Sequence, residues 1–239
     1  MNIGIYNVKY LLKLKNSVKL SGKKRLLRAK MKVLLFNGSS NHKGCTYTAL
    51  SEIEKVLNAK DIETEMVQIG NSPIADCTGC QYCRKTGNGK CVLDDIVNEC
   101  IDKCINADGF IFGSPVYYAH PAGRLLSFMD RLFYAGGYAL KYKPAAAVVS
   151  ARRAGTTAAL DPIIKHLTIN NMPVVPSNYW TMVHGRMNSP HEVMQDEEGV
   201  QIMQVLGLNM AWMLHCIEEG KKAGFEPEKI EKIHTNFIK

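Results

Sequence analysis

From Met31 onward the sequence alternates between short apolar runs and longer segments whose apolar residues recur at helical spacing. Short apolar runs of this kind are typical of strands that are buried on both faces of a parallel sheet. The predicted strands are residues 32–36, 62–69, 109–113, 145–150 and 172–175. The predicted helices are residues 46–58, 94–106, 121–134, 163–169 and 196–219. This alternation predicts an α/β fold in which a parallel sheet has helices on both faces.

Local signals suggest where two of these helices begin and end. Asp161 followed by Pro162 is typical of an N-cap and the first residue of a helix. Gly220 is typical of the residue that follows a helix. Residues 70–91 are rich in Gly, Pro and Cys and show no period, so they are predicted to form a long loop.

The composition is that of a globular protein. With 46% apolar and 22% charged residues, the chain is neither disordered nor fibrous. We assign one α/β domain to residues 31–222 and treat the charged residues 223–239 as a peripheral tail. No apolar run approaches the roughly 18 residues of a membrane-spanning helix. Eight cysteines among 239 residues do not indicate a secreted disulfide scaffold. We therefore expect a cytoplasmic protein without a membrane partner.

The net charge of +8 belongs to one end of the chain. Residues 1–30 contain nine basic and no acidic residues, which leaves 21 basic and 22 acidic residues in 31–239. The domain is therefore expected to have no nucleic-acid-binding surface. Residues 1–30 are interpreted as a disordered extension. The alternative is a basic amphipathic arm for an acidic membrane or RNA. Deleting them is expected to change neither activity nor melting temperature.

The loop after the first predicted strand, residues 37–46 (NGSSNHKGCT), is rich in small, hydroxyl and amide side chains and leads into a helix. Backbone N–H groups and hydroxyls at a helix N-terminus can bind a phosphate. The loop lacks the Gly-Lys-Ser/Thr of a Walker A motif and is not a GxGxxG turn, which argues against nucleotide hydrolysis and dinucleotide binding. On these residues alone, a helix-capping loop without a ligand is an equal alternative.

Two further loops follow the third and fourth predicted strands. Residues 113–121 (GSPVYYAHP) contain two aromatic side chains and two prolines, and residues 150–156 (SARRAGT) are rich in Gly and Arg. In an open parallel sheet, ligands bind beyond the carboxyl ends of the strands. The three loops together are therefore suited to a phosphorylated planar heterocycle.

Four cysteines lie close together in the predicted loop, with the spacing C-x2-C-x2-C-x7-C. They are Cys77, Cys80, Cys83 and Cys91. Structural zinc sites usually use two separated C-x2-C pairs, whereas a compact run of cysteines is typical of a [4Fe–4S] site. Loop thiols without a metal, or a zinc site, remain alternatives. Cys100 and Cys104 lie four residues apart on the apolar face of a predicted helix, where core packing is expected.

The order and spacing of these motifs resemble the flavodoxin-like NAD(P)H-dependent FMN reductases and, within them, the iron–sulfur flavoproteins. The resemblance covers about residues 31–220 and is carried by VLLFNGSSNHKGCT, GSPVYYAHPAG, LLSFMDRLF and SARRAGT. It implies a three-layer sandwich around a five-stranded parallel sheet of order 2-1-3-4-5. It also implies a homodimer or homotetramer.

The resemblance further implies where FMN binds. Its phosphate is expected at Ser39, Asn41, Gly44, Cys45 and Thr46. Its isoalloxazine is expected against Pro115, Val116, Tyr117 and Tyr118, with Ala151, Arg152, Gly155 and Thr156 on the other side. Asn41 stands where the family usually has an arginine, so one ionic contact to the phosphate is in doubt; Lys43 or His42 are candidates to replace it.

The expected function is that of an oxidoreductase that passes electrons from NAD(P)H through FMN to a small-molecule or protein acceptor. No side chain is assigned as a catalyst, because the flavin carries the chemistry. In the iron–sulfur flavoproteins a compact cysteine motif occupies the same place, which favours a [4Fe–4S] cluster at the four cysteines. The alternative function is a non-enzymatic electron carrier reduced by a partner such as ferredoxin. Two roles are possible for Asp130 and Arg131: they could lie at a subunit interface, or they could form a local salt bridge within their helix.

Overall fold

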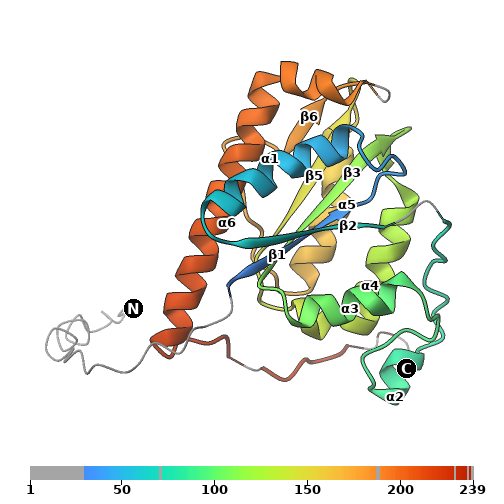
Figure 1. The fold of residues 1–239 in the computed structure, drawn as a ribbon. Coiled ribbons are helices and arrows are strands. Elements are labelled where there is room, and N and C mark those ends of the chain that lie inside the picture. The colour runs from blue at the N-terminus through green and yellow to red at the C-terminus, as the bar shows by residue number, and fades with distance from the viewer. Residues whose placement is uncertain (1–29, 70–71, 187–188, 229, 236, 238–239) are drawn as a thin grey trace, which may run out of the picture.

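The computed structural model describes residues 30–69, 72–186, 189–228, 230–235 and 237. The basic extension, except for Lys30, lies outside the described residues. In the part of the chain that is described, helices and strands alternate and form three layers (Figure 1).

The central layer is a parallel sheet of five strands in the order β2-β1-β3-β5-β6. Numbered among themselves, these five strands have the predicted order 2-1-3-4-5. A two-residue strand, β4, folds back antiparallel on the end of β3. The strands are β1 (Lys32–Asn37), β2 (Glu63–Gln68), β3 (Gly109–Tyr117), β4 (His120–Pro121), β5 (Ala145–Ala151) and β6 (Met182–His184).

The outer layers are helices whose apolar faces cover the two faces of the sheet (Figure 1). Two helices cover one face, namely α1 (Cys45–Ala59) and α6 (Glu197–Lys222). Three helices cover the other face, namely α3 (Ile96–Ile105), α4 (Gly123–Leu140) and α5 (Thr156–Ile169). A short helix, α2 (Tyr82–Thr86), lies within the predicted cysteine loop, and a 3₁₀ helix, η2 (Pro190–Gln195), precedes α6.

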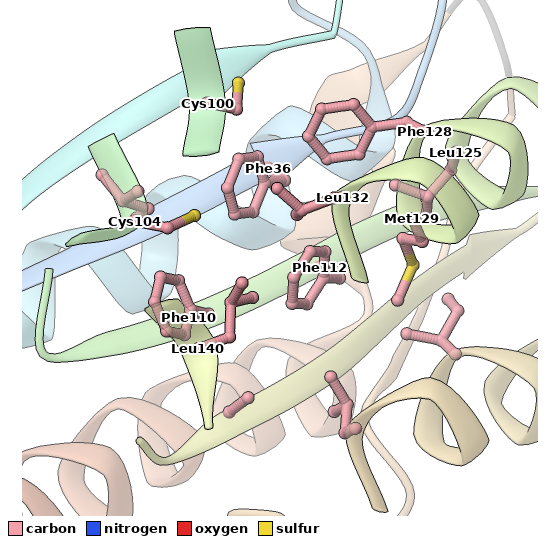
Figure 2. Close-up of a cluster of buried hydrophobic side chains, with 14 of the residues drawn as sticks. Phe36, Cys100, Cys104, Phe110, Phe112, Leu125, Phe128, Met129, Leu132 and Leu140 are labelled. Carbon is pink, nitrogen blue, oxygen red and sulfur yellow. The ribbon is translucent and has the colours of Figure 1, made fainter. Parts of the chain in front are cut away.

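The core on the side of α3, α4 and α5 is built around aromatic rings (Figure 2). The rings of Phe36 and Phe112, from neighbouring strands, stack with their centroids 4.9 Å apart, and Phe128 of α4 lies 5.4 Å from Phe36. Cys100 and Cys104 point into the same cluster and are fully buried. Burial raises the pKa of both thiols to about 12. Their predicted role in core packing is confirmed.

The last parallel strand lies farther along the chain than predicted. In the predicted strand, residues 172–175, only Val174 bridges to β5, at Ala145. The prolines at 173 and 176 have no N–H to donate to a neighbouring strand, so the pairing stops there. It resumes where Val149 donates to the carbonyl of Thr181, and β6 follows directly.

The fourth predicted helix begins earlier than its capping signal indicated. Asp161 is not an N-cap, and Pro162 lies inside α5, which starts at Thr156. The helix follows Gly155, whose φ of 92° reverses the chain at that point. Gly220 likewise lies inside α6 and does not end it. The helix continues to Lys222, and the glycine with a positive φ that follows its C-cap is Gly224.

Helix α6 is the one helix of the described residues that is long and apolar enough to cross a membrane. One side of it is nevertheless buried in the core with α1 and the sheet, including Met203, Leu206 and Met210. This packing is that of a core helix in an α/β domain.

Candidate functional site

A pocket of about 270 Å³ opens at the carboxyl ends of β1, β3 and β5. Ten of the thirteen predicted cofactor residues line it: Ser39, Asn41, Gly44, Cys45, Thr46, Pro115, Val116, Tyr117, Ala151 and Arg152. Its other lining residues, which the sequence did not single out, are Ser40, Ser150 and Gly185. Sheet topology therefore brings together three loops that lie more than thirty residues apart in sequence.

The loop after β1 is held in shape by its own side chains. The Asn37 side chain accepts from the amide of Ser39 at 3.1 Å, and the Ser39 hydroxyl accepts from the amide of Asn41 at 3.1 Å. From β2, the Gln68 side chain accepts from the side-chain NH₂ of Asn37 at 2.7 Å and donates to the backbone carbonyl of Ser39 at 2.6 Å. The end of β2 thus supports the loop that follows β1.

The N-terminus of α1 faces this pocket and has no side-chain cap among the described residues. The first N–H groups of an α-helix have no intrahelical acceptor. No side chain caps α1, and its first turn contains no acidic residue. The positive end of the helix dipole is therefore available to an anion beside Gly44, Cys45 and Thr46.

The two residues offered as replacements for the family's phosphate-binding arginine do not line this pocket, whereas the predicted Arg152 does. His42 and Lys43 are exposed, and Arg152 comes from the loop after β5. Asn41 lines the pocket and accepts from the Lys43 amide at 3.2 Å, so part of its role is to shape the loop.

The aromatic wall of the pocket is Tyr117, the last residue of β3. Its hydroxyl lies 2.9 Å from the hydroxyl of Ser40 and so joins two of the three loops. Tyr118 does not share the wall, because its φ of 61° at the turn into β4 leaves its side chain fully exposed. Gly155 and Thr156 also do not line the pocket; Gly155 precedes α5 and Thr156 begins it.

Two side-chain contacts join residues at the base of the pocket. The hydroxyls of Thr46 and Ser150 lie 2.8 Å apart and join the start of α1 to β5. The Cys45 thiol donates to the carbonyl of Arg186 at 3.2 Å. Burial raises the pKa of this thiol. A Cβ at Gly185 would lie 3.1 Å from the Cys45 sulfur, so a glycine permits this close approach. The sequence did not identify Gly185, because the strand that directly precedes it, β6, was predicted at residues 172–175.

A second and larger pocket, of about 430 Å³, is lined by all four loop cysteines. Its walls are residues 76–84, residues 91–93 and one side of α4. Cys77 and Cys80 are exposed, and Cys83 and Cys91 are half-buried. Hydrogen bonds from the Tyr82 backbone and the Thr78 side chain lower the pKa of Cys80. Among the described residues, no three His, Cys, Asp or Glu side chains are grouped closely enough to hold a metal ion.

The contacts of Asp130 and Arg131 correct one of the two sequence interpretations, the local helix salt bridge. Arg131 is 1% exposed and forms an ion pair with Asp95, which precedes α3, at 2.7 Å. Asp130 contacts His166 of α5 at 2.9 Å. Each pair joins α4 to another element, so neither is a salt bridge within one helix. Arg131 is buried, whereas the Asp130 side chain is partly exposed, and the subunit interface stays a prediction. Both residues line the cysteine pocket.

Comparisons with known proteins agree with this architecture. The family model described as NADPH-dependent FMN reductase matches residues 31–186. An iron–sulfur flavoprotein of Methanocaldococcus jannaschii is 30% identical over 195 residues, which cover 79% of this chain and 100% of the relative. An iron–sulfur flavoprotein of Methanosarcina thermophila is 30% identical over 171 residues, 70% of this chain and 86% of the relative.

Solved structures match the fold. RosB with a bound 8-demethyl-8-formylriboflavin-5'-phosphate intermediate has a TM-score of 0.64 at 13% identity, covering 87% of this chain and 92% of that one. An archaeal flavodoxin has a TM-score of 0.52 at 15% identity, and the match covers 77% of this chain and 99% of that one. At these identities the structures show a shared flavodoxin-like fold. From the family match and the iron–sulfur flavoprotein relatives together, we conclude that this chain belongs to the NADPH-dependent FMN reductase family of FMN-binding oxidoreductases.

Proposed function

We propose that this protein accepts electrons from NADPH or NADH on FMN and passes them, through a [4Fe–4S] cluster held by its cysteine loop, to an acceptor. The observation that carries the proposal is the presence of two pockets in one chain. The lining of one is suited to a phosphorylated flavin, and the other is lined by four cysteines.

The first pocket fits FMN on the chemistry of its lining. An uncapped helix N-terminus and hydroxyl side chains are suited to the phosphate. Pro115, Val116 and Tyr117 supply an apolar and aromatic surface for a planar ring. FMN, when bound, supplies the chemistry of accepting a hydride and releasing electrons singly. The protein's part is to hold the ring in place, with Arg152 as the basic side chain at the rim.

The second pocket fits an iron–sulfur cluster better than a single ion. Four cysteines line one cavity, and thiolates are the ligands of such clusters. The compact C-x2-C-x2-C-x7-C spacing of these cysteines is typical of such clusters, whereas structural zinc sites usually use two separated C-x2-C pairs. Positive φ angles at Gly79 and Gln81 curl the chain so that Cys77, Cys80 and Cys83 all face the cavity. The names of the two relatives support this choice of cluster.

The first test is an anaerobic purification followed by an absorbance spectrum and assays of iron and acid-labile sulfide. We expect flavin bands above a broad thiolate-to-iron band, with about four irons per chain. Cys91→Ser is expected to lose the iron and keep the flavin. Cys216→Ser is the matched control, because Cys216 lies on α6 outside both pockets, and it is expected to keep both. A flavin spectrum without iron in the wild-type protein would contradict the cluster.

The second test separates an enzyme from a carrier. Anaerobic mixing with NADPH or NADH is expected to bleach the flavin rapidly. If both nucleotides leave the flavin oxidised while reduced ferredoxin bleaches it, the protein is an electron carrier reduced by a partner. Since the redox chemistry belongs to the cofactors, the outcome depends on whether the FMN pocket leaves room for a nicotinamide.

A further inference from the structure

One buried side chain, Arg131, uses all of its hydrogen-bonding capacity on the cysteine loop and its neighbour α3. Its Nη1 donates to Asp95 at 2.7 Å and to the carbonyl of Ala75 at 3.3 Å. Its Nη2 donates to Asp95 at 2.8 Å and to the carbonyl of Leu93 at 2.9 Å. The remaining donor, Nε, points at the sulfur of Cys91, 3.3 Å away. A guanidinium has five N–H donors, and each has a partner here.

These contacts tie together both ends of the cysteine loop. Ala75 lies two residues before Cys77, and Leu93 lies two residues after Cys91. Arg131 belongs to α4, which packs in the core through Phe128, Met129 and Leu132 (Figure 2). The guanidinium therefore fixes the loop relative to a rigid element of the fold.

The backbone of Cys91 is also held by hydrogen bonds. The Asn98 side chain accepts from the Cys91 amide at 2.8 Å and donates to the Cys91 carbonyl at 3.1 Å. With the Arg131 contact, the amide, the carbonyl and the sulfur of this residue all have partners. By contrast, Cys77 and Cys80 are exposed.

We propose that Arg131 is a positioning residue that presents Cys91 as the fixed ligand of the cluster and raises the cluster's reduction potential through its Nε–H···S bond. This inference rests on the proposed function, because it requires a cluster in the cysteine pocket. Hydrogen bonds to ligand sulfurs are among the factors that set the potential of such clusters. Reduction adds one negative charge, which a donor aimed at a ligand sulfur stabilises.

The geometry assigns the effect to the hydrogen bond more than to net charge. Asp95 accepts two bonds from the Nη atoms and offsets the positive charge of Arg131. The Nε–H does not contact Asp95 and donates instead to the Cys91 sulfur. A lysine at this position would keep the charge but has neither an Nε–H of this geometry nor the planar fork.

The test compares Arg131→Lys with Arg84→Gln. Arg84 lines the same pocket and lies 5.4 Å from the centre of the Tyr134 ring, and no hydrogen bond joins it to a cysteine sulfur among the described contacts. After anaerobic reconstitution, iron content and midpoint potential are measured by redox titration followed by electron paramagnetic resonance. We expect Arg131→Lys to lower the midpoint potential by more than Arg84→Gln does. An Arg131→Lys potential equal to that of the wild type would overturn the inference.

A second measurement needs no substitution at Arg131 and so does not depend on how that variant folds. Wild-type protein labelled with ¹⁵N at the arginine side chains is reduced, and the hyperfine coupling of nitrogen to the cluster is recorded. A coupled arginine nitrogen that persists in Arg84→Gln supports the bond from Arg131, and the absence of any such coupling overturns it. Wild-type protein that binds no iron would overturn the proposed function as well, whereas the other negative results overturn this inference alone.

Discussion

The eight cysteines differ in what surrounds their sulfur atoms, and their reactivity should follow. The thiolate is the reactive form, so a raised pKa suppresses alkylation. Cys100 and Cys104, with pKa values raised to about 12 by burial, are expected to remain unmodified in the native protein at about pH 8. Cys80 is exposed and its pKa is lowered, so it should react first in cluster-free protein. Iodoacetamide labelling mapped by mass spectrometry measures this order.

Labelling in urea is the control for the predicted order of alkylation, because unfolding removes the burial that protects Cys100 and Cys104. All cysteines should then react at similar rates. Labelling of Cys104 in the native protein at the rate of Cys80 would contradict the buried placement.

Gly155 occupies a conformation that other residues rarely adopt. Its φ is 92°, and a Cβ there would lie 2.9 Å from a methyl group of Val116 at the FMN pocket. Gly155→Ala is therefore expected to destabilise the fold by about 1–2 kcal/mol, with weaker FMN binding. Urea unfolding and an FMN titration measure the two effects.

Gly123→Ala is the matched control for Gly155. Gly123 begins α4 with a negative φ, and a Cβ there would meet no atom within 4 Å. This substitution is expected to leave stability unchanged or to raise it by up to about 1 kcal/mol. Equal effects at the two glycines would contradict the strained backbone at Gly155.

The sequence identifies site residues that lie close together along the chain, but not those that only tertiary packing brings together. Ser39, Gly44 and Thr46 lie within a few residues of one another between a strand and a helix, so the resemblance of one short motif to the family was sufficient to predict that they share a pocket. Arg131 carries no such signal, because its partners are Ala75, Cys91, Leu93 and Asp95, which are 36 to 56 residues away. Only the packing of α3 on α4 brings them together. Tyr118 shows the opposite case: it adjoins Tyr117 in sequence, yet its positive φ turns it away.

At the scale of elements, Asp196 joins two parts of the fold. One carboxylate oxygen caps α6 by accepting from the amide of Gly199 at 3.0 Å, and the other accepts from the amide of His184 in β6 at 2.7 Å. Asp196→Ala is expected to lower the free energy of unfolding by about 1–2 kcal/mol, because it leaves both amides without these acceptors. Chemical denaturation measures the change.

Glu197→Ala is the control for the cap. Glu197 is the next residue along, is exposed, and also adds negative charge to the first turn of α6. Its loss is expected to cost only about 0.3–1 kcal/mol through the helix dipole. A cost at Asp196 no greater than at Glu197 would mean that the two hydrogen bonds contribute little.

The elements that periodicity predicted well are those buried on both faces or amphipathic over several turns, such as β1, β3 and α6. The largest errors lie at α5 and β6; in addition, α2 interrupts the predicted loop and α4 extends to Leu140. Asp161-Pro162 matches the N-cap pattern, but tertiary packing extends α5 for a turn and a half before it, burying Ala159 and Leu160. β6 is three residues long and pairs on one side only, so no sequence period could identify it.

At the scale of the whole molecule, the pocket proposed for FMN joins the loops after β1, β3 and β5, so occupying it should stabilise the fold as a unit. At about 100 times its dissociation constant, FMN is expected to add about 2.7 kcal/mol to the free energy of unfolding. For a domain of this size that corresponds to a rise of roughly 5–10 °C in melting temperature. Differential scanning calorimetry of flavin-free protein, with and without FMN, measures the rise.

Riboflavin separates the contribution of the phosphate from that of the ring. It has the isoalloxazine and the ribityl chain but nothing for the uncapped N-terminus of α1 to bind. At the same concentration it is expected to raise the melting temperature by clearly less than FMN does. Thr46→Val, at the start of α1, should reduce the rise caused by FMN while leaving the smaller rise caused by riboflavin nearly unchanged. Equal rises with the two ligands in the wild-type protein would show that α1 does not bind the phosphate.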